Sequence, residues 1–309
     1  MDKNIAFEQN AFDRLPPDSF EREKIARPPT TYAQDVWRSF KKRKTAVLGG
    51  VVLILLLIMV LIGPYLSKYD YITNDYTAIN KAPYGDHWFG TDTLGRDMWV
   101  RVWQGGRISL FIAVVATIIP WAFGMILGGL CGYIGGKLDM IVMRCVDVLL
   151  GIPSMILNIL LMVVMGAGNI GTLIIAFSVT GWLGACRGTR GLVLQLKARE
   201  FVMASQTLGA SSSRIILKHL LPNTLGVTVV SISGAIPGAI FHEAFLSYIG
   251  LGVGPPNPSW GSLIKTASEV FKEYPYQFAF PCICVALTML SCNLLGDGLR
   301  DALDPRLRS

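Results

Sequence analysis

The sequence predicts an all-α membrane protein with six transmembrane helices. Of its 309 residues, 52% are hydrophobic and only 16% are charged, which is too apolar for an ordinary soluble domain. The run 46–66 carries no charge and has the roughly 20 residues that a helix needs to cross about 30 Å of hydrocarbon. Comparable apolar runs recur at 108–132, 145–165, 170–186, 224–249 and 276–296.

The first apolar run is expected to stay in the protein as a helix. It follows 45 residues of chain, exceeds the apolar core of a normal signal peptide and lacks a small-residue cleavage site at its end. The segment before it ends in the basic stretch DVWRSFKKRKTA, which is expected to lie along the membrane surface.

The charge distribution predicts how the chain is oriented. Lys and Arg greatly outnumber acids in 27–45 and 187–218, which the positive-inside rule assigns to the cytoplasm. The segments after the first span and before the last one mix both charges and are expected outside. The chain is expected in the plasma membrane. An even number of spans then places both termini on the cytoplasmic side. The net charge of +7 follows from this topology and from lipid contact, and no aromatic-basic interleaving suggests nucleic acid.

The segments between the spans complete the expected organisation. The long external segment is rich in turn formers and aromatic residues, which suits a folded cap at the membrane interface. The expected parts are a cytoplasmic tail (1–45), the first span (46–66), the external segment (67–106), a core with five spans (107–298) that contains a cytoplasmic loop (197–222) and an external loop (250–274), and a cytoplasmic C-terminal tail (299–309).

The second span carries Gly124, Gly128, Gly132 and Gly136 at a spacing of four residues. This spacing places them on one helix face, where a neighbouring backbone can approach closely; a pore-lining or hinge role is the alternative. Several spans also contain prolines that permit kinks, at Pro120, Pro153, Pro237 and Pro281.

No catalytic, metal or cofactor site is expected. The motif HEAF begins like a zinc-protease motif at His242, but Leu246 stands where the second histidine is required. The glycine-rich run before Asp139 is not a phosphate loop, because Leu138 follows Lys137 where Ser or Thr is needed. The six cysteines form no CxxC pair and are expected to be small core residues.

Three charged residues are expected within or at the edge of the membrane, where a lone ionised group costs several kcal/mol. Arg144 and Asp147 are spaced so that they can pair on one helix face, and an ion pathway is the alternative. Glu243 lies near the outer end of the fifth span. The sequence shows no chain of carboxylates at the membrane midplane, which disfavours a proton-coupled secondary transporter without excluding it.

The stretch FVMASQTLGASSSRIILKHLLPN is polar in an otherwise apolar chain. A helix over 198–208, a left-handed turn at Gly209 and a second helix capped by Ser211 or Ser212 and ended by Pro222 are expected. Apolar side chains of the second helix should pack toward the bundle, namely Ile215, Ile216 and Leu220. From the residues alone, the stretch is either a rigid docking element or a topology loop.

This stretch resembles the EAA loop of ABC importer permeases. Met203 stands where that motif has its glutamate, which puts an ion pair to the ATPase in doubt. The motifs FGTDTLGRD, MRCVDVLLGIPSM, AFLSYIGLGVGPPNPSWGSLI and GDGLRDALDPRL are similar to the C-type permeases of the dipeptide/oligopeptide/nickel importer family. The residues that match the loop motif are Ala204, Ser205, Gly209, Ile215, Leu221 and Pro222.

The resemblance implies the ABC type I importer permease fold and a cytoplasmic coupling helix. It implies a non-catalytic subunit that pairs with a second permease, two cytoplasmic ATPases and an extracytoplasmic binding protein, and that imports peptides, with nickel or another small solute as alternatives. A secondary peptide transporter or a channel is the alternative of another class. Coupling is expected from Ala204, Ser205, Gln206, Thr207, Leu208, Gly209, Ala210, Ser211, Ser212, Ser213 and Pro222. Docking of the binding protein or gating of the path is expected from Asp92, Arg96, Asp97, Pro255, Pro256 and Trp260.

Overall fold

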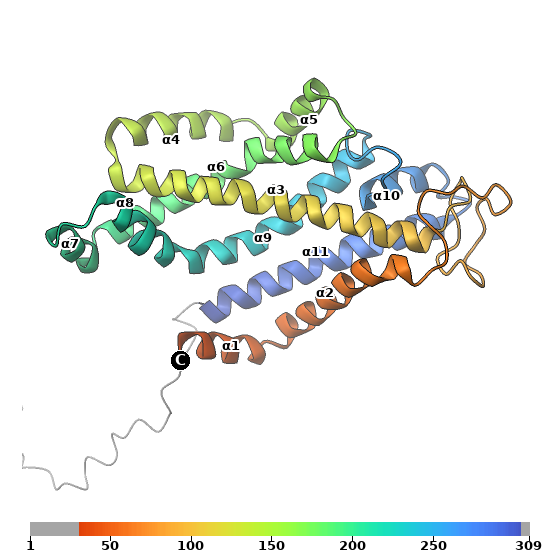
Figure 1. Ribbon diagram of the computed structural model, residues 1–309, viewed down its shortest axis with the longest axis horizontal. Coiled ribbons are helices and arrows are strands. Elements are labelled where there is room, and N and C mark those ends of the chain that lie inside the picture. Colours follow the sequence, from red (N-terminus) through yellow and green to blue (C-terminus); the bar gives the residue numbers. More distant parts are fainter. Residues whose placement is uncertain (1–30, 304–309) are drawn as a thin grey trace, which may run out of the picture.

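The computed structural model describes residues 31–303, so the parts of the expected tails in 1–30 and 304–309 lie outside the described residues. The described chain is helical apart from isolated β-bridges, and its long helices run side by side along one axis (Figure 1). The helices are α1 (Tyr32–Lys42), α2 (Lys44–Ile62), α3 (Met98–Ile134), α4 (Gly136–Leu150), α5 (Ser154–Met165), α6 (Ile170–Lys197), α7 (Glu200–Thr207), α8 (Ser212–Arg214), α9 (Leu221–Tyr248), α10 (Trp260–Glu269) and α11 (Pro275–Leu303).

The number of membrane spans agrees with the prediction. Five helical stretches, built on α2, α3, α6, α9 and α11, are long and apolar enough to cross a membrane, and the pair α4 and α5 can form a sixth. The first span continues beyond α2 into a single 3-10 turn, Gly63–Tyr65. All-α architecture with six passes is therefore confirmed within the described residues.

The third span, expected over 145–165 with Pro153 permitting a kink, is broken into two helices. It consists of α4 and α5, whose axes differ by 87°. Pro153 stands directly before α5 and has no amide hydrogen to donate. Proline also disfavours helical geometry in the residue before it, so the chain turns at Ile152.

The second span begins earlier than expected, at Met98 and not at residue 108. The carboxylate of Asp97 caps the helix by accepting a hydrogen bond from the Val100 amide at 2.9 Å. Pro120 is accommodated inside α3. The segment expected outside is therefore shorter, a cap over 66–97, and the first turns of α3 lie at the same end of the bundle (Figure 1).

Glycines let α3 approach α6 closely. A Cβ on Gly124 would lie 2.9 Å from the Cβ of Ala185, and one on Gly132 would lie 2.9 Å from the carbonyl oxygen of Arg190. Both distances are too short for real side chains, so glycine is required. Gly136 does not belong to this face, because it begins α4 with a φ of +63° and has open space around its Cβ position.

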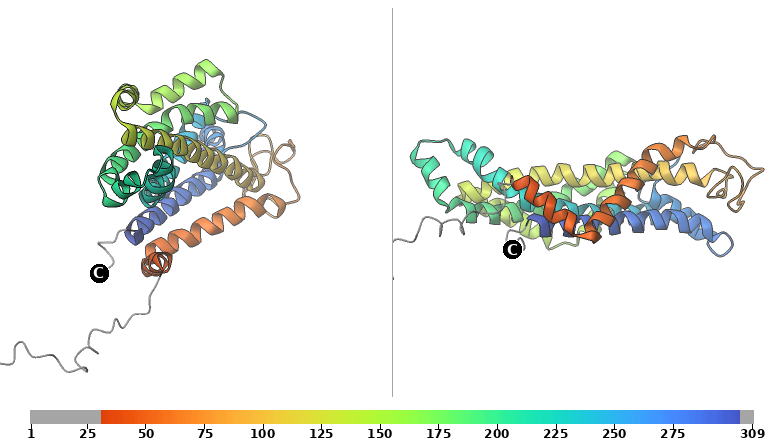
Figure 2. Two further views of the ribbon diagram at one scale, coloured as in Figure 1. Left: turned by 60° about the vertical axis from the view of Figure 1, so that its left-hand side comes forward. Right: turned by 90° about the horizontal axis from the view of Figure 1, so that it is seen from below.

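The two ends of the bundle carry different structures. The turn between α7 and α8 forms one end, and the cap over 66–97 together with α10 forms the other (Figures 1 and 2). Near the described C-terminus, Arg43 forms an ion pair with Asp301 at 2.9 Å. This contact ties the start of α2 to the last turn of α11, on the half of the molecule that carries α7 (Figure 1).

Candidate coupling loop and translocation path

The polar stretch folds as a helix, a sharp turn and a second helix. α7 ends at Thr207, and Gly209 has a φ of +77°, the left-handed conformation that glycine adopts most readily. The hydroxyl of Ser211 then accepts a hydrogen bond from the Arg214 amide at 3.4 Å and caps the next helix. The predicted turn at Gly209 and the predicted cap are both confirmed, with Ser211 as the capping residue.

A buried cluster fixes this loop to the bundle. Val202 of α7 and Ile215, Ile216 and Leu220 beyond the turn are all buried and pack with Val193 of α6. The predicted inward packing of the three residues after the turn is confirmed. Both halves of the loop therefore share one core with α6 and the start of α9.

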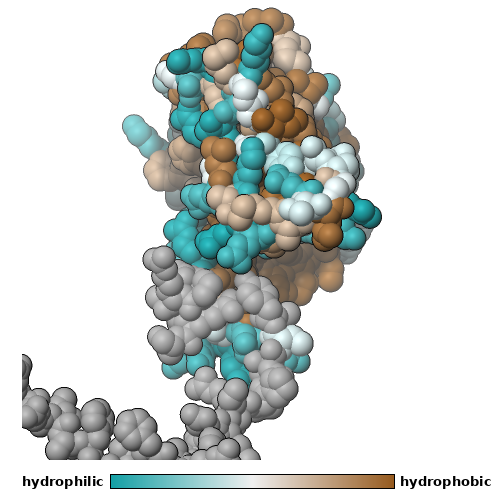
Figure 3. Space-filling model, turned by 90° about the vertical axis from the view of Figure 1, so that its left-hand side faces the viewer, coloured by the Kyte–Doolittle hydropathy of each residue, from teal (hydrophilic) through white to brown (hydrophobic). Residues whose placement is uncertain are grey.

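The solvent-facing surface of the Gly209 loop exposes large apolar side chains. Phe201 is 40% exposed, Met203 49% and Leu208 87%. Figure 3 looks onto this end of the molecule and shows hydrophilic residues spread over it with hydrophobic ones between them. The hydroxyls of Ser205 and Thr207 donate hydrogen bonds to backbone carbonyls of α7 at 2.8 and 3.0 Å, so both donors are already bonded within their own helix. Exposed apolar groups on a polar rim are typical of a protein docking surface.

Pro222 does not end the second helix, contrary to expectation. The chain continues from α8 through a π-helical turn, Ile215–Leu220, directly into α9. Pro222 occupies the first turn of α9, where a missing amide hydrogen costs least, and the wider hydrogen bonding of the preceding turn makes room for its ring. The loop is therefore joined to the fifth span without a break.

Two cavities follow each other along α3, α6 and α9. One has a volume of about 290 Å³ and is lined by Thr117, Asn158, Thr180 and His242 among others. The other, of about 300 Å³, is lined by Thr189, Thr228 and Ser231 among others. Both contain Trp121, Gly184 and Ala185 in their walls, so they are neighbours.

The polar side chains in the mainly apolar walls of these cavities were not predicted from the sequence. Asn158 is buried, and its side-chain oxygen accepts a hydrogen bond from the Thr180 hydroxyl at 3.1 Å. Amide and hydroxyl groups inside a membrane bundle mark paths for polar solutes. The sequence does not show that single polar residues in different apolar runs face the same cavity, because this depends on how the helices pack.

The charges at α4 pair differently from the prediction. Asp147 forms an ion pair with Arg187 of α6, and Asp139 forms one with Arg190 of the same helix at 2.6 Å (Nη2 to Oδ2). The expected pair of Arg144 with Asp147 is not formed, because Asp147 is turned toward α6. The two ion pairs bind α4 to α6.

Three of the six residues expected to dock the binding protein or gate the path are buried. Asp92 is 3% exposed and Asp97 2%, and Trp260 is fully buried. These three side chains are therefore too buried for direct contact with a docked protein, and their role in gating stays a prediction. Pro255 and Pro256, which are joined by a cis peptide bond, are exposed and line a cleft.

The buried acids hold the cap together. Asp92 accepts from Arg96 Nε at 2.8 Å and lies 3.4 Å from Arg101 Nε, and Asp97 contacts His87 Nδ1 at 2.7 Å. Trp260 donates its indole N–H to the carbonyl of Val102 at 2.9 Å. These bonds join the cap, α3 and α10.

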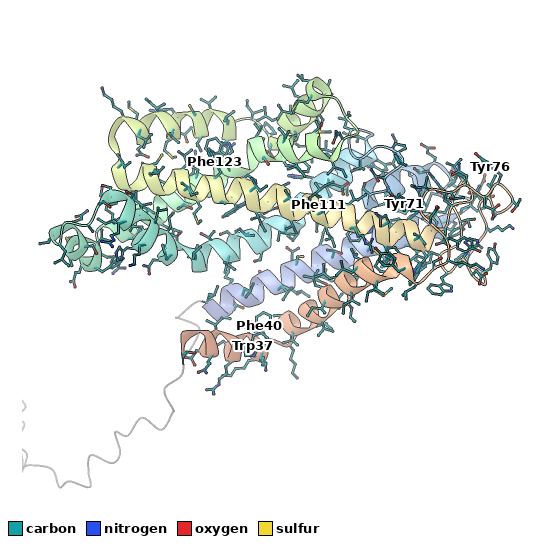
Figure 4. The ribbon with its side chains drawn as sticks, viewed as in Figure 1. Trp37, Phe40, Tyr71, Tyr76, Phe111 and Phe123 are labelled. Atoms are coloured by element: carbon teal, nitrogen blue, oxygen red, sulfur yellow. The ribbon has the colours of Figure 1, made fainter. Side chains whose placement is uncertain are left out.

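The exposed part of the cap is held by short local bonds, and Tyr71 and Tyr76 mark it in Figure 4. Hydrogen bonds from the Thr73 amide and hydroxyl hold the pKa of Asp70 below its usual range, and bonds from Thr77 do the same for the pKa of Asp75. Both carboxylates are therefore ionised at neutral pH and fold the chain around themselves.

Glu243 is fully buried near the outer end of α9. Its carboxylate accepts hydrogen bonds from Ser109 at 2.8 Å and from Ser247 at 2.7 Å. The hydroxyl of Ser259 donates to that of Ser247 at 3.3 Å, which extends the network to the start of α10. The sequence indicated Glu243 as a charge in the membrane but not its partners.

Within the described residues, no group of three or more His, Cys, Asp and Glu side chains could hold a metal ion. The six cysteines are free thiols. The main features of the described residues are an exposed apolar face on the Gly209 loop, two neighbouring cavities along the bundle and a cleft beside Pro255 and Pro256.

Comparison with known proteins relates these features to transport. Residues 124–309 match the family described as binding-protein-dependent transport system inner membrane component. Residues 31–83 match the N-terminal transmembrane domain of oligopeptide transport permease C.

Full-length relatives agree with the family matches. The dipeptide transport system permease protein of Bacillus subtilis (strain 168) is 47% identical over 93% of this chain and 90% of its own length. The oligopeptide transport system permease protein of the same organism is 44% identical over 97% of this chain and 98% of its own. The corresponding oligopeptide permease of Escherichia coli (strain K12) is 40% identical over 89% and 91%.

Proposed function

Since the chain belongs to the family of binding-protein-dependent transport system inner membrane components, we propose that it is the C-type permease subunit of an ABC importer for di- and oligopeptides. The observation that carries the proposal is the pair of cavities along α3, α6 and α9, whose mainly apolar walls carry amide and hydroxyl groups, in line between the outer cleft and the Gly209 loop. Amides and hydroxyls suit the peptide backbone, which every peptide presents whatever its sequence. Nickel or another small solute is the alternative cargo of the same family.

A second permease completes the path in this proposal. α4 and α5 bury only Val146, Asn158 and Met162, and the rest of their apolar surface is partly or fully exposed. Lipid covers part of such a surface, and a partner permease covers the part beside the cavities. The translocation path then runs between the two different permeases.

Two cytoplasmic ATPases act on the Gly209 loop. The exposed apolar face around Leu208 supports this part of the proposal, because a large apolar side chain in water favours a protein partner. Both termini and this loop then face the cytoplasm, and the cap faces outward to an extracytoplasmic binding protein. ATP hydrolysis belongs to the partners, and no covalent chemistry occurs in this chain.

Transport follows alternating access. Closure of the ATPase dimer moves the loop, and the loop moves α9 because a continuous helix joins them. At the outer end of α9 the Glu243 network connects the motion to α3 and α10. The path then opens outward to accept a peptide.

Reconstitution tests the proposal. The complete complex in liposomes should take up a labelled tripeptide only with ATP, both permeases, the ATPases and the binding protein all present. Uptake by this chain alone, or uptake that continues without ATP, would overturn the importer function. Uptake of nickel but not of peptide by the complete complex would support the alternative cargo.

A further inference from the structure

The outer cleft is a built site whose chemistry the transport function does not yet explain. It has a volume of about 430 Å³ and lies between the loop that contains Pro255 and Pro256, the start of α3 and the helix α10. Its charged lining residues are Arg96, Arg101, Lys265 and Glu269. The cations outnumber the acids even when the neighbouring Asp92 is included, so the cleft favours an anion.

Arg101 is the buried part of this site. Its side chain is only 8% exposed, and Nη1 donates to the carbonyl of Tyr71 at 2.9 Å. Its Nε is buried and has no hydrogen-bond acceptor, although the Asp92 carboxylate lies 3.4 Å away. A buried N–H without an acceptor is costly, so acceptor oxygens are in short supply around this guanidinium group.

The two guanidinium groups share a single counter-ion. Arg96 donates from Nε to Asp92 at 2.8 Å, and Arg101 has the same carboxylate as its only ion-pair partner among the described residues. One carboxylate cannot satisfy two guanidinium groups, because each guanidinium prefers to bind both oxygens of its own carboxylate. Unused donors therefore remain at the wall of the cleft.

Lys265 completes the site from the opposite wall. Its ammonium lies over Gly250, where it would be 2.7 Å from an added Cβ, and it forms no ion pair within the described part of the chain. Glu269 stands one helical turn further along α10 and partly balances the charge at the rim. The cleft therefore presents two largely buried arginines and one exposed lysine.

The cleft lies directly above the polar path. Ser247 lines the cleft, and His242 lines the first intramembrane cavity. At about 1.5 Å per residue these positions are roughly 7.5 Å apart along α9, and Glu243 lies between them. A ligand in the cleft therefore lies next to the first intramembrane cavity.

We propose that the cleft binds the terminal carboxylate of the peptide as it leaves the binding protein. This inference rests on the proposed function and specifies what the permease recognises in its substrates. A free α-carboxylate is common to linear peptides of any sequence, and a cleft of this size admits one end of an extended peptide. An acidic side chain of the binding protein offers the same chemical group, and the test below separates the two sources.

Direct binding gives the first test. Trialanine and its C-terminal amide are compared by saturation-transfer NMR with the complete permease and ATPase complex in nanodiscs, without the binding protein. Only the free acid should bind to the wild type. Lys265→Met should weaken its binding by about fivefold, the size of one exposed charge interaction, whereas Lys265→Arg should retain it. Lys272→Met, a matched exposed lysine outside the cleft, should have no effect.

Equal signals for the acid and the amide, or no effect of Lys265→Met, would overturn the inference. Transport then identifies the source of the carboxylate. If the cleft holds the peptide, Lys265→Met lowers the rate of trialanine uptake at saturating binding protein. If Lys265→Met only raises the concentration of binding protein needed for half-maximal uptake, the cleft docks the binding protein and the inference is wrong. Wild-type complex that takes up no peptide at all contradicts the proposed function instead.

Discussion

Ser109 of α3 donates a hydrogen bond to the buried carboxylate of Glu243 in α9, with 2.8 Å between the two oxygens. The same hydroxyl accepts a hydrogen bond from the backbone amide of Trp260 at 3.1 Å. One serine therefore joins three helices at the outer end of the path. Opening of that end requires these bonds to break or to move together.

Replacement of this hydroxyl should destabilise the protein. Ser109→Ala removes a donor to a buried acid and an acceptor for a buried amide, at a cost of about 1–3 kcal/mol for each unsatisfied group. Thermal unfolding of the purified complex should show a clearly lower midpoint. Ser231→Ala is the control, since that hydroxyl bonds only to a carbonyl of its own helix, and it should change stability by less than about 0.5 kcal/mol.

The close approach of α3 and α6 predicts a second effect. Gly128→Ala places a methyl group against the backbone of Cys186, where the Cα would be only 3.0 Å away, and should cost on the order of 1–3 kcal/mol. Gly191→Ala on α6 meets open space and should be neutral or slightly stabilising. Equal unfolding midpoints for the two variants would show that the helices do not pack in this way.

The ion pairs between α4 and α6 are tested by a double-mutant cycle. Asp139→Asn and Arg190→Gln should each destabilise the protein, and the double variant should reveal a coupling of about 1 kcal/mol or less, since both groups are partly exposed. Arg144→Gln should show no coupling to Asp147→Asn, because Asp147 pairs with Arg187. A measurable coupling of Arg144 to Asp147 would contradict the observed rotation of α4.

Docking of the ATPase should depend on apolar contact. Leu208 is 87% exposed, and its burial on docking is worth about 1.5–3 kcal/mol, so Leu208→Ser should weaken ATPase association by roughly tenfold or more. Met203→Glu should weaken association less than Leu208→Ser, because Met203 is 49% exposed and so offers less apolar area for docking. Fluorescence titration of the ATPases onto permease in nanodiscs measures both. If ATPase association depended strongly on Met203 and not on Leu208, docking through the apolar contact of Leu208 would be contradicted.

The spans and the turn could be predicted from the sequence because they follow from local rules. A helix that crosses hydrocarbon needs an uncharged run of fixed length, and this condition locates α2, α3, α6, α9 and α11. The left-handed turn follows from Gly209 between two helix-forming stretches. The break before α5 was not predicted, although Pro153 was noted, since prolines within spans are as often accommodated, as at Pro120 and Pro237.

The partners of the charged groups could not be predicted, because they depend on how each helix is rotated about its axis. Asp147 lies 40 residues from Arg187 in the chain, and Ser109 lies 134 residues from Glu243. Local spacing favoured Arg144 for Asp147, but packing turned that carboxylate toward α6. The family resemblance implied a docking or gating role for Asp92, but it did not show that two arginines pair with this carboxylate inside the protein.

The central claim is that force from the ATPases enters through the turn at Gly209. The most direct measurement is peptide uptake and ATP hydrolysis by the reconstituted complex with Gly209→Val and Gly209→Asn. Valine resists the left-handed φ of +77°, whereas asparagine tolerates it. We expect Gly209→Val to abolish peptide-stimulated hydrolysis and uptake while the complex stays folded, and Gly209→Asn to retain most of both. Normal coupled uptake by the folded valine variant would contradict the claim.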